Sequence, residues 1–277
     1  MSVILHISDT HFGTEQTPVV DALLRLSSQQ APELIILSGD LTQRATAQEF
    51  DAARIFVKRL AAPALLVIPG NHDIPLYHLG ERLLTPYRRY RRAFGADLEP
   101  VFESEALLVI SVNTTRRLRH IEGEVSAAQI ARVSKRLRQA GSRQLRLVVT
   151  HQPVHVVHAE DEPNLLNGGE QAIRAWAEAG ADMILGGHIH RPYVCNLQER
   201  LGSVGQYLWV VQAGTALSDR IRFDAGNSVN LIRHDGPAAP QRCTVERWDF
   251  DDASQSFLQV DANVLLCHPR RGESTSA

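Results

Sequence analysis

The first half of the chain alternates short apolar runs with longer segments in which apolar residues repeat at helical spacing. Runs at residues 3–7, 34–37 and 65–68 have the length and composition of buried strands. Residues 19–29 and 46–60 carry their apolar side chains on one face of a helix. Strands that alternate with helices predict a mainly parallel sheet covered by helices, and therefore an α/β fold.

The middle of the chain continues this alternation. A basic segment at residues 82–94 is predicted to be one helix. Ser126, followed three residues later by Gln129, suits the capping box that begins a helix. The pattern predicts strands over residues 107–112, 145–149 and 183–185, and helices over residues 126–140 and 171–179.

Beyond residue 190 the helical pattern fades and strands follow one another. We expect strands at residues 208–212, 228–233 and 244–250, with Gly, Pro and Asp in the turns between them. Two halves that each end in strands predict two β-sheets packed face to face, with helices outside. The 277 residues show no repeat and no linker, so one domain over residues 1–268 is predicted, with a disordered polar tail at 269–277.

Composition and charge exclude some classes of protein. Apolar residues at 44% and charged residues at 22% are ordinary for a globular protein, and a net charge of −2 favours neither nucleic-acid nor membrane binding. The three cysteines lack the spacing of a zinc site and cannot all pair, which indicates a reducing compartment. No stretch approaches the roughly 20 apolar residues of a membrane span. These features predict a cytoplasmic protein.

Residue types that bind metals follow five of the predicted strands. In an open α/β sheet, ligands bind at the carboxyl ends of the strands, where successive loops meet. We therefore expect these five groups to converge on one site. They are Asp9-Thr10-His11, Gly39-Asp40, Gly70-Asn71-His72-Asp73, His151 and Gly187-His188-Ile189-His190.

The number of donors points to more than one ion. The groups offer two carboxylates, one amide oxygen and four imidazoles, which exceeds the needs of one four-coordinate metal and suits two that share a ligand. Asp40 is the natural bridge, since a carboxylate has two oxygens. Nitrogen and oxygen donors without thiolate suit Mn, Fe, Zn, Co or Ni. We expect two divalent or trivalent ions, with Mn, Fe and Zn the first candidates.

The order DxH, GD, GNHD, H and GHxH resembles the signature of the calcineurin-like metallophosphoesterases. Within that superfamily the chain looks most similar to the bacterial class III cyclic-nucleotide phosphodiesterases and their relatives. The resemblance implies the metallo-dependent phosphatase fold, a four-layer αββα sandwich with two mixed sheets. It also implies that one ion is held by Asp9, His11, Asp40 and His190, and the other by Asp40, Asn71, His151 and His188.

The expected reaction is hydrolysis of a small phosphodiester, with a 3′,5′-cyclic nucleotide as the first candidate. Two ions can hold a bridging hydroxide, which attacks phosphorus while the ions neutralise the phosphoryl oxygens. His72 follows the ligand Asn71 and is not needed for coordination, so we expect it to contact the phosphate and assist the leaving group. Asp73 is expected either to orient His72 or to anchor the loop.

Several alternatives stay open from the sequence. The same metal core serves phosphomonoesterases and nucleases, although a nuclease needs a longer basic track than residues 82–92 supply. A non-catalytic scaffold is disfavoured because no expected ligand is missing. The expected partner is a small phosphoester, with no extended nucleic acid and no membrane, and a homodimer remains open. Residues 155–169 depart from the short proline-rich loop of cyclic-nucleotide enzymes, which leaves the substrate open.

Three further predictions concern single residues. His155 and His158 follow His151 but are expected to be loop or surface histidines. Thr215 follows a predicted strand and is expected either near the site or in an ordinary turn. The tyrosines of the basic segment 82–92 are expected to pack inward.

Overall fold

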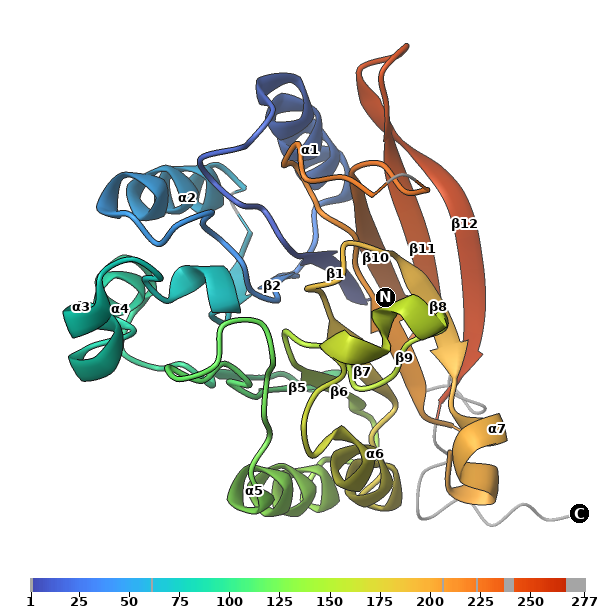
Figure 1. Cartoon of the computed structure of the whole chain (residues 1–277). Helices are drawn as coiled ribbons and strands as arrows, with labels where there is room; N and C mark the ends of the chain where they lie inside the picture. The colour runs from blue at the N-terminus through green and yellow to red at the C-terminus, as the bar shows by residue number, and fades with distance from the viewer. Residues whose placement is uncertain (1, 61, 206, 223, 237–241, 268–277) are drawn as a thin grey trace, which may run out of the picture.

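The computed structural model describes residues 2–60, 62–205, 207–222, 224–236 and 242–267. In this part of the chain two six-stranded sheets form the centre of the molecule (Figure 1). The predicted end of the domain at residue 268 and the predicted tail at 269–277 lie outside the described residues.

The first sheet combines three parallel strands from the start of the chain with three antiparallel strands from its end. Its order is β12-β11-β10-β1-β2-β3, and β1 pairs in parallel with β2 and antiparallel with β10. Its strands are β1 (Ser2–Ile7), β2 (Leu34–Leu37), β3 (Ala64–Val67), β10 (Ser228–His234), β11 (Arg242–Asp251) and β12 (Ser256–Leu266).

The second sheet is parallel at its centre and antiparallel at both edges, in the order β4-β5-β6-β7-β9-β8. Both sheets are therefore mixed. The strands are β4 (Val101–Glu103), β5 (Leu107–Ser111), β6 (Leu145–Val149), β7 (Met183–Gly186), β8 (Tyr193–Asn196) and β9 (Trp209–Gln212).

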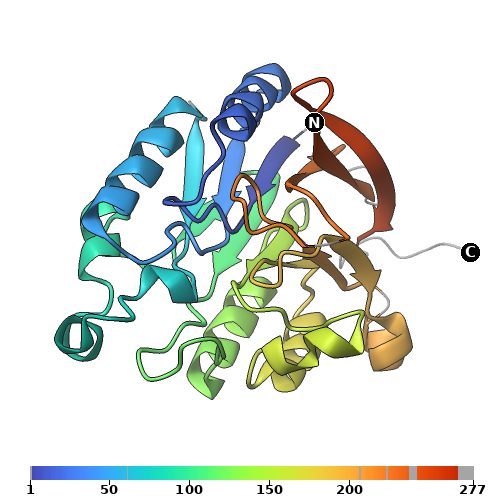
Figure 2. The same cartoon turned by 45° about the horizontal axis from the view of Figure 1, so that its top comes forward.

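Helices cover the outer face of each sheet. In both views α1 (Thr17–Gln30) and α2 (Ala47–Arg59) lie on the side opposite α5 (Ala127–Arg138) and α6 (Gly169–Glu178) (Figures 1 and 2). The predicted capping box of Ser126 and Gln129 is confirmed at the start of α5. The remaining helical segments are α3 (Leu79–Leu84), α4 (Arg88–Phe94), α7 (Gln198–Leu201), η1 (Asn71–Asp73), η2 (Ala159–Asn164) and η3 (Gly202–Gly205).

Alternating side chains of the strands build three buried layers. On β1, Leu5 and Ile7 pack with the helices of the first sheet, whereas Ile4 points to the second sheet. Val109 of β5 joins the same layer between the sheets, and Leu108 faces α5 and α6. Full burial of such a side chain stabilises the fold by about 1.5–3 kcal/mol. This layering confirms the predicted αββα sandwich.

The prediction of one helix over residues 82–94 is wrong. The structure has two short helices, α3 and α4, with Thr85-Pro86-Tyr87 between them. Proline lacks the backbone N–H that a helix requires and pushes the preceding residue out of the helical region. Thr85 accordingly ends α3 with φ −142°. The tyrosines pack inward as expected, and the Tyr90 hydroxyl donates to the Val67 carbonyl at 2.8 Å.

Strands β4, β8 and β12 were not predicted. β4 spans three residues and β8 four, which is too short for a periodic signal. β12 is an edge strand with mostly exposed side chains. No helix in the described ranges is long and apolar enough to cross a membrane.

Candidate metal centre

The five groups of metal-binding residue types meet at one end of the two sheets. They lie in the loops after β1, β2, β3, β6 and β7, whose parallel partners within each sheet end at the same edge. Their Asp and His side chains form three overlapping sets. Within each set, the possible ligand atoms all lie within 4.8 Å of one another. The predicted convergence on one site is therefore confirmed.

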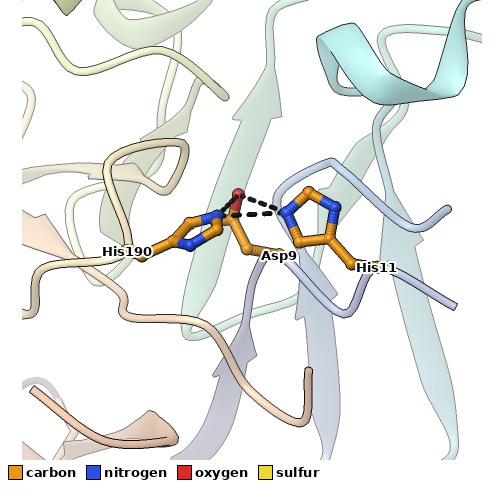
Figure 3. A group of neighbouring side chains, drawn as sticks. All are labelled: Asp9, His11 and His190. Atoms are coloured by element: carbon orange, nitrogen blue, oxygen red, sulfur yellow. Dashed lines mark hydrogen bonds and ion pairs between the residues drawn. The ribbon is translucent and has the colours of Figure 1, made fainter. Parts of the chain in front are cut away.

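Asp9, His11 and His190 form the first set (Figure 3). The Nε2 atoms of the two histidines lie 3.0 Å apart, and Asp9 Oδ1 lies 3.3 Å from His190 Nε2 and 3.7 Å from His11 Nε2. Ligands about 2.1 Å from one ion stand about 3.0–3.4 Å apart at octahedral or tetrahedral angles. The two spacings to His190 Nε2 thus fit ligands of one cation, and the spacing of 3.7 Å between Asp9 and His11 is slightly wider.

A second set surrounds His151. Its Nε2 atom lies 3.1 Å from Asn71 Oδ1 and 3.3 Å from Asp40 Oδ1. The His188 ring stands nearly perpendicular to the His151 ring, with the centroids 5.2 Å apart. One amide oxygen, one carboxylate and two imidazoles are again donors that suit a transition metal.

Asp40 lies between the two sets. Its Oδ1 atom faces His151, whereas its Oδ2 atom lies 3.8 Å from His11 Nε2. The carboxylate is almost completely buried and belongs to sets on both sides. Its two oxygens are thus turned toward different groups of ligands.

Buried atoms without hydrogen-bond partners support a fit to cations. Among the described side chains, Asp9 Oδ1 and both ring nitrogens of His188 are buried and make no hydrogen bond. Leaving such an atom unpaired costs about 1–3 kcal/mol. A bound cation would satisfy Asp9 Oδ1 and one nitrogen of His188.

Backbone carbonyls orient other histidines of the site. His151 Nδ1 donates to the Ser38 carbonyl at 2.8 Å, and His190 Nδ1 donates to the Arg220 carbonyl at 2.7 Å. Because a carbonyl only accepts, each Nδ1 carries a proton and each Nε2 is left for a metal. This is the outer-shell arrangement typical of metal-binding histidines.

The histidines of the site differ in the direction in which their pKa values are shifted. Burial lowers the pKa of His11 and of His188 to about 3, so both are neutral and able to coordinate. Burial also opposes a charge on His151, but Asp40 beside it raises its pKa to about 9. The surrounding histidines hold the pKa of Asp40 below its usual range despite burial. The ionised Asp40 is therefore a buried negative charge, with His11 and His188 as neutral nitrogen donors near it.

The backbone of the site is strained. Five of the clustered residues adopt left-handed φ values, a region that side chains other than glycine occupy at a cost of about 1–3 kcal/mol. They are Asp9 (52°), His11 (41°), Asp40 (50°), His188 (74°) and His190 (56°). Each lies just after a strand, so the chain turns sharply and aims the side chain across the end of the sheets.

Two glycines allow the loops to approach one another. A Cβ atom on Gly187 would lie 1.8 Å from Ser8 Oγ and 2.4 Å from Asp9 Oδ2. A Cβ atom on Gly70 would lie 2.1 Å from the Asp40 nitrogen. Both glycines therefore permit close packing of the loops at the site.

His72 belongs with His11 and Asp40 to the third set, and its ring is held in place. Its Nδ1 donates to the Gln43 carbonyl at 2.9 Å, and its Nε2 accepts from Arg220 Nη1 at 3.1 Å. Its backbone N–H donates to Asp40 Oδ1 at 2.8 Å. The ring stands edge-on to His11, with the centroids 4.9 Å apart. His72 is therefore within reach of anything bound between the two sets.

Asp73 joins two of the loops. Its Oδ2 accepts from the N–H groups of Gly70 and Leu41, and its Oδ1 accepts from the N–H and hydroxyl of Thr42, at 2.8–3.1 Å. No hydrogen bond between the side chains of Asp73 and His72 is present in the described structure. Of the two expected roles, the contacts are those of an anchor.

Replacing Asp73 with asparagine should lower the free energy of unfolding by about 1–3 kcal/mol, because the amide nitrogen would face two buried donors. Burial and nearby Asp40 raise the pKa of Asp73 to about 6, so the comparison belongs at pH 8, where the carboxyl is ionised. Denaturant unfolding measures the change. Asp51→Asn on the exposed face of α2 is the control and should stay within about 0.5 kcal/mol of the parent. Equal stability of the two variants would contradict the anchoring role.

Arg220 and Gln43 belong to the site but were not predicted. Arg220 lies between β9 and β10, and its Nη1 is 3.1 Å from Gln43 Oε1 and 3.4 Å from His11 Nδ1. The one residue of this segment that the sequence did single out was Thr215, whose hydroxyl donates to the Asp9 carbonyl at 2.7 Å. Thr215 follows β9, a sixth strand that ends at the site.

The loop after His151 is held by ion pairs and supplies no ligand to the three sets. Asp161, fully buried in η2, pairs with Arg191 at 2.6 Å and with Arg222 at 3.1 Å. His158 is exposed, and His155 Nδ1 accepts from Arg200 Nη1 at 3.0 Å. Both histidines are therefore loop residues, as expected.

Comparisons with known proteins agree with this geometry. A probable cyclic nucleotide phosphodiesterase of Synechococcus sp. is 27% identical over 201 residues, 69% of this chain and 74% of the relative. A probable glycerophosphodiester phosphodiesterase GpdQ of Arcobacter nitrofigilis is 24% identical over 203 residues, 68% of this chain and 72% of the relative.

Among solved structures, purple acid phosphatase PPD1 from yellow lupin (Lupinus luteus) seeds has the same fold, with a TM-score of 0.70 at 11% identity. The match covers 96% of this chain and 53% of the phosphatase. The family model for calcineurin-like phosphoesterases matches residues 2–192, well over half of the sequence. The chain therefore belongs to the calcineurin-like phosphoesterase family and is a hydrolase of phosphoric esters.

Proposed function

We propose that the protein hydrolyses small phosphodiesters at a centre of two metal ions bridged by Asp40. The observation that carries the proposal is the orientation of Asp40, whose two oxygens are turned toward different groups of donors. One ion would be held by Asp9, His11, Asp40 and His190, and the other by Asp40, Asn71, His151 and His188. When bound, such a pair of ions lowers the pKa of water and neutralises the charge of a phosphoryl group.

The residues of the chain itself position the substrate and transfer one proton to the leaving group. Asp73 fixes the loops that carry Asp40 and Asn71 relative to each other. His72 presents Nε2 toward the site because Nδ1 is engaged by the Gln43 carbonyl. A proton acquired at Nε2 can pass to the departing oxygen of the ester, which leaves as an alcohol.

A cavity next to His72 is suited to the leaving group. Its volume is about 190 Å³. It is lined by Gln43, Arg44, His72, Ile74, Leu76, Tyr77 and His120. Polar and apolar walls at this size suit the alcohol of a small diester better than a long nucleic acid.

Two substrate classes follow from these observations. A 3′,5′-cyclic nucleotide is the first candidate, supported by the Asn71-His72-Asp73 sequence and by the name of the Synechococcus relative. A glycerophosphodiester is the second, because the small cavity suits a glycerol group and the Arcobacter relative bears that name. Both are small phosphodiesters and require the same arrangement of ligands.

A substrate panel tests the proposal. The purified protein, loaded in turn with Mn, Mg, Fe or Zn, is assayed with bis-p-nitrophenyl phosphate, cyclic nucleotides, glycerophosphodiesters, nucleoside monophosphates and short DNA. We expect turnover of the small diesters, little cleavage of DNA, and loss of activity after chelation that returns when metal is added. A preference for monoesters would overturn the diesterase assignment. Absence of bound metal and of turnover with every ion would overturn the metal-centred mechanism.

A further inference from the structure

Arg220 places a cationic group at the centre of the site. Its Nη1 atom lies 3.1 Å from His72 Nε2, 3.1 Å from Gln43 Oε1 and 3.4 Å from His11 Nδ1. All three of these acceptors are uncharged. Gln43 offers an amide oxygen, and an imidazole nitrogen can accept from a guanidinium only when it has no proton, which makes the ring neutral. The guanidinium thus touches the loops that follow β1, β2 and β3.

Arg220 differs from its neighbours in its lack of a carboxylate partner. Arg191 pairs with Glu160, Asp161 and Asp224, and Arg222 pairs with Glu160 and Asp161. In the part of the chain that the structure describes, Arg220 forms no ion pair. A half-buried arginine with only neutral acceptors is able to exchange them for an anion.

The backbone that carries Arg220 is firmly held. The Arg220 N–H donates to Ser218 Oγ at 3.2 Å, and Ser218 Oγ is 2.6 Å from the Thr215 hydroxyl, which contacts the Asp9 carbonyl. The Arg220 carbonyl accepts from His190 Nδ1. Arg222 Nη1 donates to the Ile189 carbonyl at 3.1 Å. The guanidinium is therefore positioned by the same loops that carry Asp9 and His190.

We propose that Arg220 binds a non-bridging oxygen of the substrate phosphate and stabilises the charge that develops there. This inference rests on the proposed phosphodiesterase function and adds a substrate contact to it. A hydrogen bond between a guanidinium and a phosphate oxygen is charge-assisted on both sides and belongs to the strong class, roughly twice as strong as a bond between neutral groups. The planar fork also suits phosphate geometry. An arriving phosphate therefore draws the guanidinium away from His72 and Gln43.

The exchange has a consequence for His72. While Arg220 donates to His72 Nε2, that nitrogen must keep its lone pair and cannot carry the proton needed by a leaving group. Once the guanidinium turns to the phosphate, the Nε2 lone pair is no longer engaged by Arg220. Substrate binding and readiness of His72 for proton transfer are thus linked through one side chain.

Substitution of Arg220 tests the proposal. Arg220→Met should lower kcat/KM for bis-p-nitrophenyl phosphate by about 10²–10³-fold, the usual effect of removing one donor to a developing oxyanion. Arg220→Lys should recover part of the loss because it keeps the charge but not the fork. Arg54→Met on exposed α2 is the control for loss of a positive charge and should match the parent. Metal content by elemental analysis should stay unchanged in all three variants.

Binding of inorganic phosphate gives a second readout. Isothermal titration calorimetry of the metal-loaded protein should show weaker phosphate binding in Arg220→Met by about tenfold or more, and unchanged binding in Arg54→Met. Equal phosphate affinity in the parent and in Arg220→Met would overturn the proposal. Turnover by the parent tests the proposed function independently, so the two failures are distinguishable.

A double substitution separates contact with phosphate from an effect through His72. If Arg220 binds the phosphate, Arg220→Met should still lower kcat/KM clearly in a His72→Ala background, although the factor will differ from that in the parent because the two side chains are in contact. If its effect disappears in the His72→Ala background, Arg220 acts only by orienting His72, and the proposed phosphate contact is wrong.

Discussion

Replacing Asp40 with alanine is expected to abolish hydrolysis of bis-p-nitrophenyl phosphate and to remove both metal ions. The expectation follows from its position, with Oδ1 3.3 Å from His151 Nε2 and Oδ2 3.8 Å from His11 Nε2. A bridging carboxylate contributes a ligand and a negative charge to both ions, so its loss leaves two incomplete sites. Elemental analysis of the purified variant and its turnover with added Mn measure the two effects.

Two further variants sharpen this test. Asp40→Asn keeps the shape and one oxygen but lacks the charge, and should retain more metal than Asp40→Ala and less than the parent. Asp51→Ala, on the exposed face of α2, controls for loss of an aspartate and should keep full metal content and activity. If Asp40→Ala retained the parent's metal content, the bridging role would be wrong.

Replacing His72 with alanine is expected to slow turnover by about 10²–10⁴-fold while metal content stays unchanged. The Gln43 carbonyl fixes Nδ1 of the ring, so Nε2 is the nitrogen that can serve the leaving group once Arg220 has turned to the phosphate. The loss should be larger for an alkyl diester than for bis-p-nitrophenyl phosphate, since nitrophenolate departs without a proton. Steady-state rates with both substrates measure this difference.

His158→Ala supplies the control, because His158 is an exposed histidine of the loop after β6. It should match the parent with both substrates. The competing assignment of His72 is a metal ligand, since one of its ring nitrogens lies in one set with His11 and Asp40. Loss of metal from His72→Ala would favour that assignment and contradict a role confined to the leaving group.

The regular parts of the fold were predictable because burial follows periodicity. Strands such as β2 were placed to the residue, since a fully apolar run between polar residues has one reasonable interpretation. The break at Pro86 was visible in the sequence but was outweighed by the helical pattern on both sides. Strand β12 was missed because it owes its conformation to pairing with β11 and to an irregularity of register at Arg247 and Trp248.

The site was predictable to the extent that its residues stand next to strand ends. Each of the seven expected ligands directly follows a strand or its first turn, and the topology then brings them together. Arg220 was not predictable in this way, because it lies several residues into an irregular segment. Its approach to His72 depends on how that segment is tied to Asp9 and His190. Such contacts have no signature in local sequence.

The left-handed backbone of the site lowers stability at positions that the activity requires. These positions are Asp9, His11, Asp40, His188 and His190. Glycine adopts these φ values without a steric penalty, so five positions of the molecule are held by residues that a purely structural optimum would not choose. Stabilising designs that follow backbone preference alone would select glycine there and would dismantle the centre. Any search for a more thermostable form of this protein should hold these positions constant and seek its gains in the outer helices and edge strands.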